Sequence, residues 1–278
     1  MQIIDTYPDF PQEYTLENLR NYYKKYPTIF DAYFANHCQN TDERLIKAMK
    51  RYPSDQATIK KVHFRIQKEL KYVINEYKTR YKLTFPIDVN LIVGAYGSNA
   101  YTHRQIIPDI TFSLERLPSE QEPLRVIIAH EFGHASHNIF SDRYQIDWKR
   151  MQWEHPYIWL LQEGAATHFS RQVIPDLKSS VYFSYNNEGD DWLDFANQHK
   201  NEIIRSFKSD ILEDPRTVFK EWFSINGGTR FGHTRLAYYI ADAMFQEFVH
   251  RKGELGALLS WKENPSFFHE VEEWLAQF

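Results

Sequence analysis

Residues 125–134, RVIIAHEFGH, form a mostly apolar run that ends in three ionisable side chains. Upstream of this run, Ser119 followed three residues later by Glu122 resembles a capping box, so we predict a helix from there to about Phe140. Apolar residues fall on most sides of this helix, which indicates that it is buried. Two histidines and a glutamate in a buried helix are costly without a partner, so the segment predicts a bound metal ion.

The spacing of the polar residues favours zinc. His130 and His134 are four positions apart, and on a helix they therefore share one face and can converge on one ion. Zinc accepts imidazole nitrogens and keeps an open coordination position for chemistry. The side chain of Glu131 points away from the helix face that carries the two histidines, but it stays close to a water molecule at the metal. We therefore predict that Glu131 is the general base.

A third ligand is expected from a helix at about 157–173. Glu163 follows His134 by 29 positions and lies among apolar and small residues, and residues 164–166 would allow a close approach to the motif helix. We predict that Glu163 completes the site for one Zn²⁺ ion. An alternative is that Glu163 is a salt-bridged glutamate near a helix start. The other candidate ligands are Glu154, His155 and His168.

His137 is a less suitable ligand. It lies about 10 Å along the helix axis from His130, at 1.5 Å per residue, and we expect it to pack or to support the site from outside. In addition, His137 and Phe140 occupy the positions where the metzincin arrangement has a glycine and a third histidine, which excludes that class.

Composition limits the function classes. The formal charge of -4, from 33 Lys+Arg and 37 Asp+Glu, argues against a nucleic-acid partner. The single cysteine, Cys38, cannot form an internal disulfide, and no secretory signal or membrane span is recognised in the sequence. We therefore expect a soluble cytoplasmic protein without a membrane partner.

The pattern predicts an α+β fold in two parts. Residues 1–82 are expected to be helical, with a long helix over 55–80, and residues 83–278 to form the domain that carries the site. In that domain, 83–145 would hold strands at 89–93 and 110–114 and the motif helix, whereas 146–278 would be helical. Further helices are expected at about 157–173, 203–211 and 233–252, with a short one ending at Trp274.

Residues 109–114 are expected to form the strand that borders a substrate cleft. Free backbone groups of such a strand would pair with an extended peptide by strand addition. The alternative is an ordinary interior strand.

Together, the His130–His134 motif and the later Glu163-Gly164-Ala165-Ala166 segment resemble the gluzincin group of metallopeptidases over roughly residues 88 to 250. The resemblance implies a zincin-like fold, with a small sheet whose cleft-edge strand packs on the motif helix, two zinc histidines and a glutamate ligand. The motif and the later Glu163 segment together are also loosely similar to uncharacterised bacterial zinc-dependent proteases.

The same resemblance implies a downstream Tyr or His that stabilises the oxyanion. His233 and Tyr238 are similar to these late elements, Tyr239 is an alternative to Tyr238, and Arg230 or Arg235 could bind a substrate carboxylate. The segment 94–99 lacks the glutamate that many gluzincin aminopeptidases carry, which argues against aminopeptidase activity.

We therefore expect a zinc-dependent peptidase that acts on a peptide or protein substrate. Two other classes stay open: a catalytically silent zinc-containing module that binds peptides or partners, and a zinc hydrolase of a non-peptide substrate. The intact Glu131 argues against the silent module.

Overall fold

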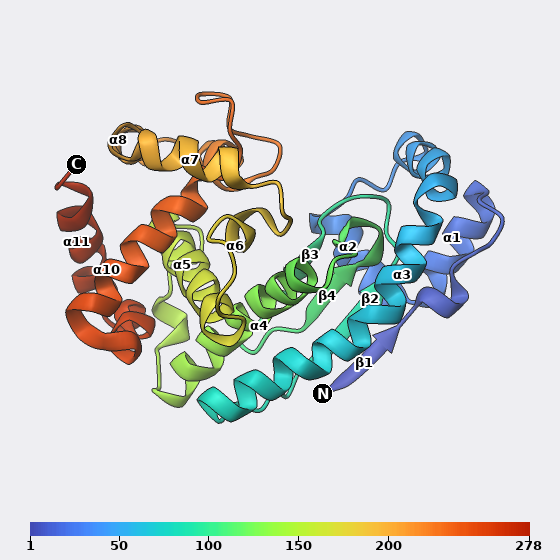
Figure 1. Cartoon of the computed structure of the whole chain (residues 1–278), viewed down its shortest axis with the longest axis horizontal. Helices are drawn as coiled ribbons and strands as arrows, with labels where there is room; N and C mark the ends of the chain where they lie inside the picture. Colours follow the sequence, from blue (N-terminus) through green and yellow to red (C-terminus); the bar gives the residue numbers. More distant parts are fainter. The chain divides into compact units, whose positions relative to one another are not determined.

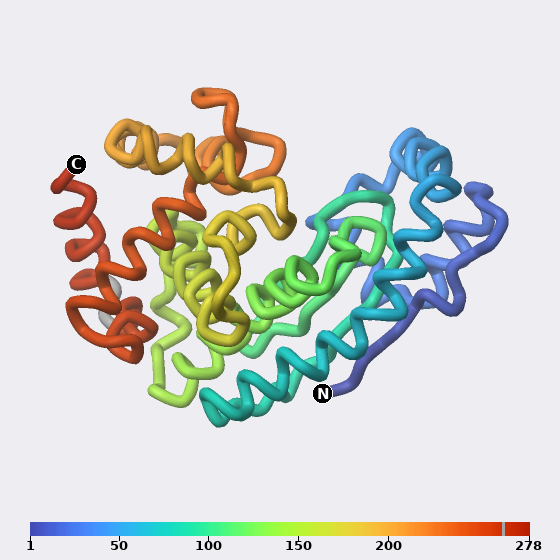
Figure 2. The backbone as a smooth tube through the Cα atoms, in the orientation of Figure 1, coloured from blue at the N-terminus to red at the C-terminus, as the bar shows by residue number. Residues whose placement is uncertain are grey.

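The computed structural model describes residues 1–262 and 265–278 in full, and the chain has an α+β architecture (Figures 1 and 2). It divides into two compact units, Met1–Glu131 and Phe132–Phe278. The boundary falls inside one helix, α4 (Gln121–Arg143), so the predicted metal-binding motif begins in the first unit and ends in the second.

The first unit contains a four-stranded mixed sheet. Its strands are β1 (Gln2–Asp5), β2 (Asp88–Ile92), β3 (Ala100–Thr102) and β4 (Ile110–Ser113), in the order β1-β2-β4-β3. β1, β2 and β4 are parallel, and β3 is antiparallel to β4. The strands predicted at 89–93 and 110–114 are confirmed as β2 and β4, whereas β1 and β3 were missed.

The prediction that 109–114 forms a cleft-edge strand is wrong. β4 pairs with β2 on one side and with β3 on the other, so its backbone is not free to accept an added strand. The two edges of the sheet are β1 and β3.

Helices of the first unit are α1 (Leu16–Lys25), α2 (Pro27–Asn36) and α3 (Asp42–Tyr81). The predicted helix over 55–80 is part of α3, which begins earlier because Thr41 accepts a hydrogen bond from the backbone of Arg44. The division expected at residue 82 does not coincide with the two units, because β1 pairs with β2 and joins the N-terminal region to the sheet.

The second unit is helical, as expected for residues 146–278. After the end of α4 come α5 (Pro156–Val173), α6 (Val181–Ser184), α7 (Asp190–Gln198), α8 (Lys200–Asp210), α9 (Pro215–Val218), α10 (Leu236–Leu258) and α11 (Asn264–Leu275). Short turns of 3-10 or π-helix link some of these elements. α10 starts three positions later than expected from His233 and is kinked at Gly253, whose φ of 74° lies in the left-handed region. No helix in the fully described ranges is both long and apolar enough to cross a membrane.

Candidate metal centre

Helix α4 presents the two motif histidines on one face. His130 is 2% exposed, and Ala129 and Phe132 on either side of the His130–Glu131 pair are fully buried. The Tyr77 hydroxyl of α3 donates a hydrogen bond of 2.6 Å to the Ala129 carbonyl, which fixes the turn just before His130. Because both histidines belong to this single continuous helix, one turn separates their rings.

Glu163 lies on α5, beside the second histidine. The distance from His134 Nε2 to Glu163 Oε2 is 3.7 Å. The close approach depends on a glycine, since a Cβ at Gly133 would lie 2.9 Å from the Cα of Ala166. The predicted close packing of the small residues after Glu163 is therefore confirmed at Ala166. Gly164 has a different neighbour, because a Cβ there would lie 2.5 Å from the Ala241 carbonyl of α10.

Three donor atoms form the group that could hold a metal ion. One ligand atom each from His130, His134 and Glu163 lies within 4.8 Å of the others. Among the fully described side chains, this is the only group of three or more His, Cys, Asp or Glu residues with that property. Two imidazole nitrogens and one carboxylate are the donor set of a catalytic zinc site, in which bonds of about 2.0–2.1 Å place tetrahedral ligands about 3.3 Å apart. The residues present therefore fit zinc.

Two of the rival ligands are engaged elsewhere. His155 caps α5 by accepting a hydrogen bond from the Tyr157 backbone, and its ring stacks on Phe268. His168 Nε2 donates to Glu254 Oε1 at 2.8 Å, and neither histidine belongs to the group of three donors.

His137 is a packing residue. Its Nε2 donates to the Leu258 carbonyl at 2.8 Å, and its ring stacks on Trp261 with centroids 4.1 Å apart. Burial lowers the pKa of His137 to about 3, so the ring is neutral. The predicted packing role of His137 agrees with these contacts.

The late candidates lie around the start of α10. The His233 ring stacks on Phe195 at 4.0 Å, and the Arg235 guanidinium lies 5.2 Å from the centre of the Tyr238 ring. His233 is not part of the metal-binding group, and the oxyanion role of His233 or Tyr238 stays a prediction. The Tyr239 hydroxyl donates to Asn197 Oδ1 at 3.0 Å.

Both candidate arginines for binding a substrate carboxylate already have protein partners. Arg230 forms an ion pair of 2.6 Å with Asp210. Arg235 donates to the Phe183 carbonyl at 2.7 Å. A substrate carboxylate would have to compete with these contacts.

Sequence reasoning missed a side-chain cage around residues 93–97, the turn that leads from β2 toward the edge strand β3. Tyr33 accepts hydrogen bonds from the Ala95 and Gly97 backbones, at 3.1 and 2.9 Å. The Tyr22 hydroxyl accepts from Val93 N at 3.1 Å, and the Tyr52 hydroxyl donates to the Gly94 carbonyl at 2.5 Å. The polar groups of the turn are thus hydrogen-bonded to tyrosines that are distant in the sequence. No local sequence pattern predicts these contacts.

A carboxylate completes this cage. Glu115 Oε1 accepts a hydrogen bond of 3.1 Å from Tyr96 N, and its Oε2 is shielded from solvent. Burial raises the pKa of Glu115 to about 7. Glu115 is therefore the acidic group that holds the backbone of the 94–97 turn, although it lies outside that segment of the sequence.

Comparison of the chain with protein-family models, with curated proteins and with solved structures gave no match.

Proposed function

We propose that the protein is a zinc-dependent peptidase of the gluzincin type with a zincin-like fold, in which His130, His134 and Glu163 hold one Zn²⁺ ion. The observation that supports this proposal most strongly is the convergence of these three donors within 4.8 Å, with Glu131 next to the first of them. A structural zinc site would use four protein ligands, whereas three ligands leave a position for a reactant.

Glu131 is the proposed general base. A bound Zn²⁺ ion supplies Lewis-acid polarisation and lowers the pKa of water at the metal. Glu131 is only 7% exposed, so its carboxylate is largely screened from bulk solvent while it accepts a proton from the attacking water. The same carboxyl group then returns the proton to the leaving amine.

The antiparallel edge strand β3 supports a peptide as the substrate. β3 has a strand neighbour on one side only among the described strands, so its outer edge could pair with an extended polypeptide. This replaces β4 as the proposed strand for peptide binding.

The proposal is tested by metal analysis and by hydrolysis of a peptide library. The purified protein is expected to carry near-stoichiometric zinc, and Glu131→Gln is expected to keep that zinc while hydrolysis falls by about 10²- to 10⁴-fold. Hydrolysis that is unchanged in Glu131→Gln, or a parent protein that does not bind zinc, would rule the mechanism out. Zinc binding without hydrolysis of any peptide would favour a binding module or a different substrate.

A further inference from the structure

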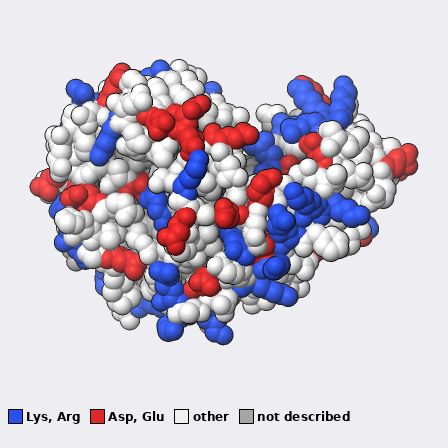
Figure 3. All heavy atoms as spheres, in the orientation of Figure 1, with Lys and Arg blue, Asp and Glu red and all other residues white. Residues whose placement is uncertain are grey.

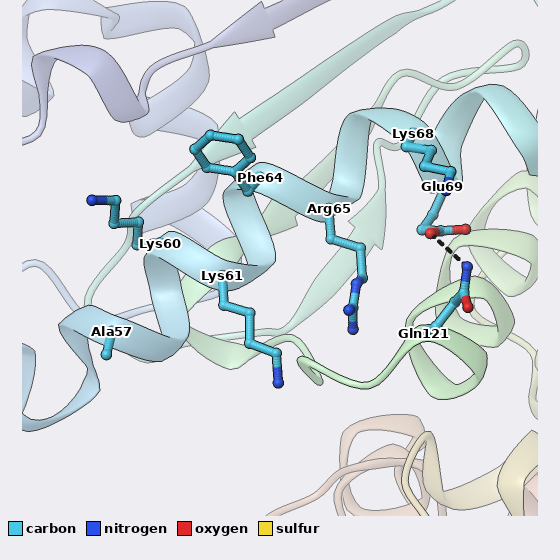
Figure 4. A pocket seen from close by; sticks show the side chains of 8 residues that line it. All are labelled: Ala57, Lys60, Lys61, Phe64, Arg65, Lys68, Glu69 and Gln121. Atoms are coloured by element: carbon cyan, nitrogen blue, oxygen red, sulfur yellow. Dashed lines mark hydrogen bonds between the residues drawn. The ribbon is translucent and has the colours of Figure 1, made fainter.

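One face of α3 carries a row of basic side chains along a shallow groove. Lys60, Lys61, Phe64, Arg65 and Lys68 recur at helical spacing, so their side chains leave α3 from successive turns (Figure 4). Gln121, the first residue of α4, lines the same groove, which has a volume of about 620 Å³. Figure 3 shows Lys and Arg side chains gathered along α3 on the face drawn.

The positive charge of this groove is only partly balanced by acidic neighbours. Lys60, Lys61 and Lys68 are exposed and form no ion pair with any described side chain. The acidic residue that lines the groove, Glu69, is only 1% exposed and is already paired with Arg125 at 2.5 Å.

Of the three lysines, only Lys61 has a hydrogen bond to a described neighbouring group. Glu69 also accepts a hydrogen bond of 3.0 Å from Gln121 (Figure 4). Arg65 donates to the Ser119 carbonyl, and Lys61 donates to the Ser119 hydroxyl at 3.3 Å. Glu120 is exposed and interacts electrostatically with Lys61, so its charge opposes an incoming anion.

Phe64 adds an apolar contact in the middle of the basic row. Its side chain is 81% exposed, although a phenylalanine gains about 1.5–3 kcal/mol when it is fully buried. An exposed aromatic ring between lysines fits a partner that offers both negative charge and an apolar side chain.

We propose that this groove, formed by Lys60, Lys61, Phe64, Arg65 and Lys68, docks an acidic polypeptide segment that carries an apolar residue. Charge complementarity favours an acidic partner, because none of the three lysines forms an ion pair with a described side chain. A single polypeptide segment can enter the groove, whereas a bilayer surface is broad and flat. A nucleic acid is disfavoured because the chain is acidic overall, at -4, and because binding of successive bases uses several stacking rings rather than one.

The groove is connected to the proposed metal centre through α4. Gln121 and His130 are nine residues apart on this helix, which corresponds to about 14 Å along its axis. The acidic segment is thus proposed to belong to the polypeptide substrate, because the groove and a ligand of the proposed metal centre lie on the same helix. This last step rests on the proposed peptidase function, whereas docking itself does not.

Docking is tested with Glu131→Gln protein, so that cleavage cannot disturb the measurement. The probe is a short fluorescent peptide in which glutamates flank one leucine, and binding is followed by fluorescence anisotropy at low salt. Reversal of Lys60, Lys61 and Lys68 to Glu is expected to weaken binding by at least about tenfold, since each exposed charge pair contributes a factor of roughly 1.5 to 5. Phe64→Ala is expected to weaken it by about fivefold.

The matched control reverses three exposed lysines outside the groove, Lys24, Lys50 and Lys208, and it should leave binding within about twofold. Equal binding of a peptide with lysines in place of glutamates, or equal loss in both triple variants, would overturn the proposal. Tighter binding of single-stranded DNA or of phosphatidylserine vesicles than of the peptide would also overturn it.

A second measurement separates docking from catalysis. In zinc-loaded parent protein, attaching the acidic segment to a cleaved peptide should lower KM and leave kcat unchanged, and the Lys60/Lys61/Lys68 reversal should remove that gain. If the parent hydrolyses no peptide but the anisotropy results hold, the peptidase proposal fails and the docking surface stands.

Discussion

Two glutamates of the proposed centre carry the same charge but are expected to act differently. Glu163→Ala should weaken zinc binding by at least about tenfold, because it removes one of three ligands. Glu131→Gln should leave zinc affinity nearly unchanged while it removes the base. The measurement is competition with a chromogenic chelator for both variants. Similar losses of zinc in both would mean that Glu131 is a ligand rather than the base.

A second residue-scale prediction concerns Glu115 in the tyrosine cage. Its pKa in the folded protein is about 7, above the ordinary value of 4.5, so the folded state holds the proton more tightly than the unfolded state does. The stability that Glu115 contributes is therefore complete below about pH 4.5 and is lost as the pH rises through 7.

Glu115→Gln should lack this pH dependence, because glutamine keeps an oxygen for Tyr96 N and never ionises. Urea denaturation measures the free energy of unfolding of both proteins between pH 4.5 and 8. The stability of the variant relative to the parent should increase as the pH rises from 4.5 to about 7 and should then level off. If the stabilities of the two proteins change with pH in parallel, ionisation of Glu115 does not destabilise the folded state.

Sequence could predict the relations between residues that are close together along the chain. His130 and His134 lie one turn apart on a helix, and this relation needs no tertiary information. The prediction of Glu163 as a ligand needed only a second helix in which small residues follow the glutamate. The contact of Tyr33 with Gly97 spans 64 residues of sequence, and no periodicity carries such information. The cage and the basic groove therefore became visible only in three dimensions.

At the scale of elements, the crossing of α5 and α10 depends on Gly164. A Cβ at this position would lie 2.5 Å from the Ala241 carbonyl and 2.7 Å from the Phe245 Cβ. Gly164→Ala is therefore expected to destabilise the protein by about 1–3 kcal/mol despite the better helix propensity of alanine. Chemical denaturation measures this difference.

Gly256→Ala is the matched control in α10. The nearest atoms to its Cβ would be Cβ and Cγ of the flexible Lys252 side chain, at 3.1 and 3.2 Å. This variant should be neutral or stabilised by up to about 1 kcal/mol. If Gly164→Ala behaves like Gly256→Ala, the close crossing of α5 and α10 is not tight in solution.

Long elements were predicted better than short ones. α4 and α5 have enough residues for their apolar pattern to be recognised, and their predicted extents agree with the structure to within about three residues. β3 has three residues, too few for an alternating pattern to stand out. Since β3 was missed, β4 was taken for an edge strand.

At the scale of the whole molecule, bound metal should raise thermal stability. A ligand present at about 100 times its Kd adds about 2.7 kcal/mol to the free energy of unfolding, which corresponds to a rise in Tm of roughly 5–10 °C. Scanning calorimetry of the parent protein with zinc and after chelation should show this difference.

The control for this measurement is a protein that lacks both motif histidines. His130→Ala/His134→Ala should show no zinc-dependent rise, and magnesium should have no effect on the parent, because Mg²⁺ prefers oxygen ligands. A rise of the same size in the double variant would indicate that zinc binds elsewhere.

The division into units could not be predicted, because it depends on a strand contributed from the N-terminus. The sequence suggested a helical region over 1–82, but β1 pairs with β2 and links residues 2–5 to 88–91. Two parallel strands that are so far apart in the sequence leave no local sequence pattern that predicts their pairing.

The same pairing affects how the chain folds while it is being made. Gln2 lies 86 residues before Asp88, so at 5–20 residues per second a ribosome needs about 4–17 s to make the partner of the first strand. During that interval the backbone groups of residues 2–5 have no β2 strand to pair with. β1 therefore cannot pair with β2 until 86 further residues have been made.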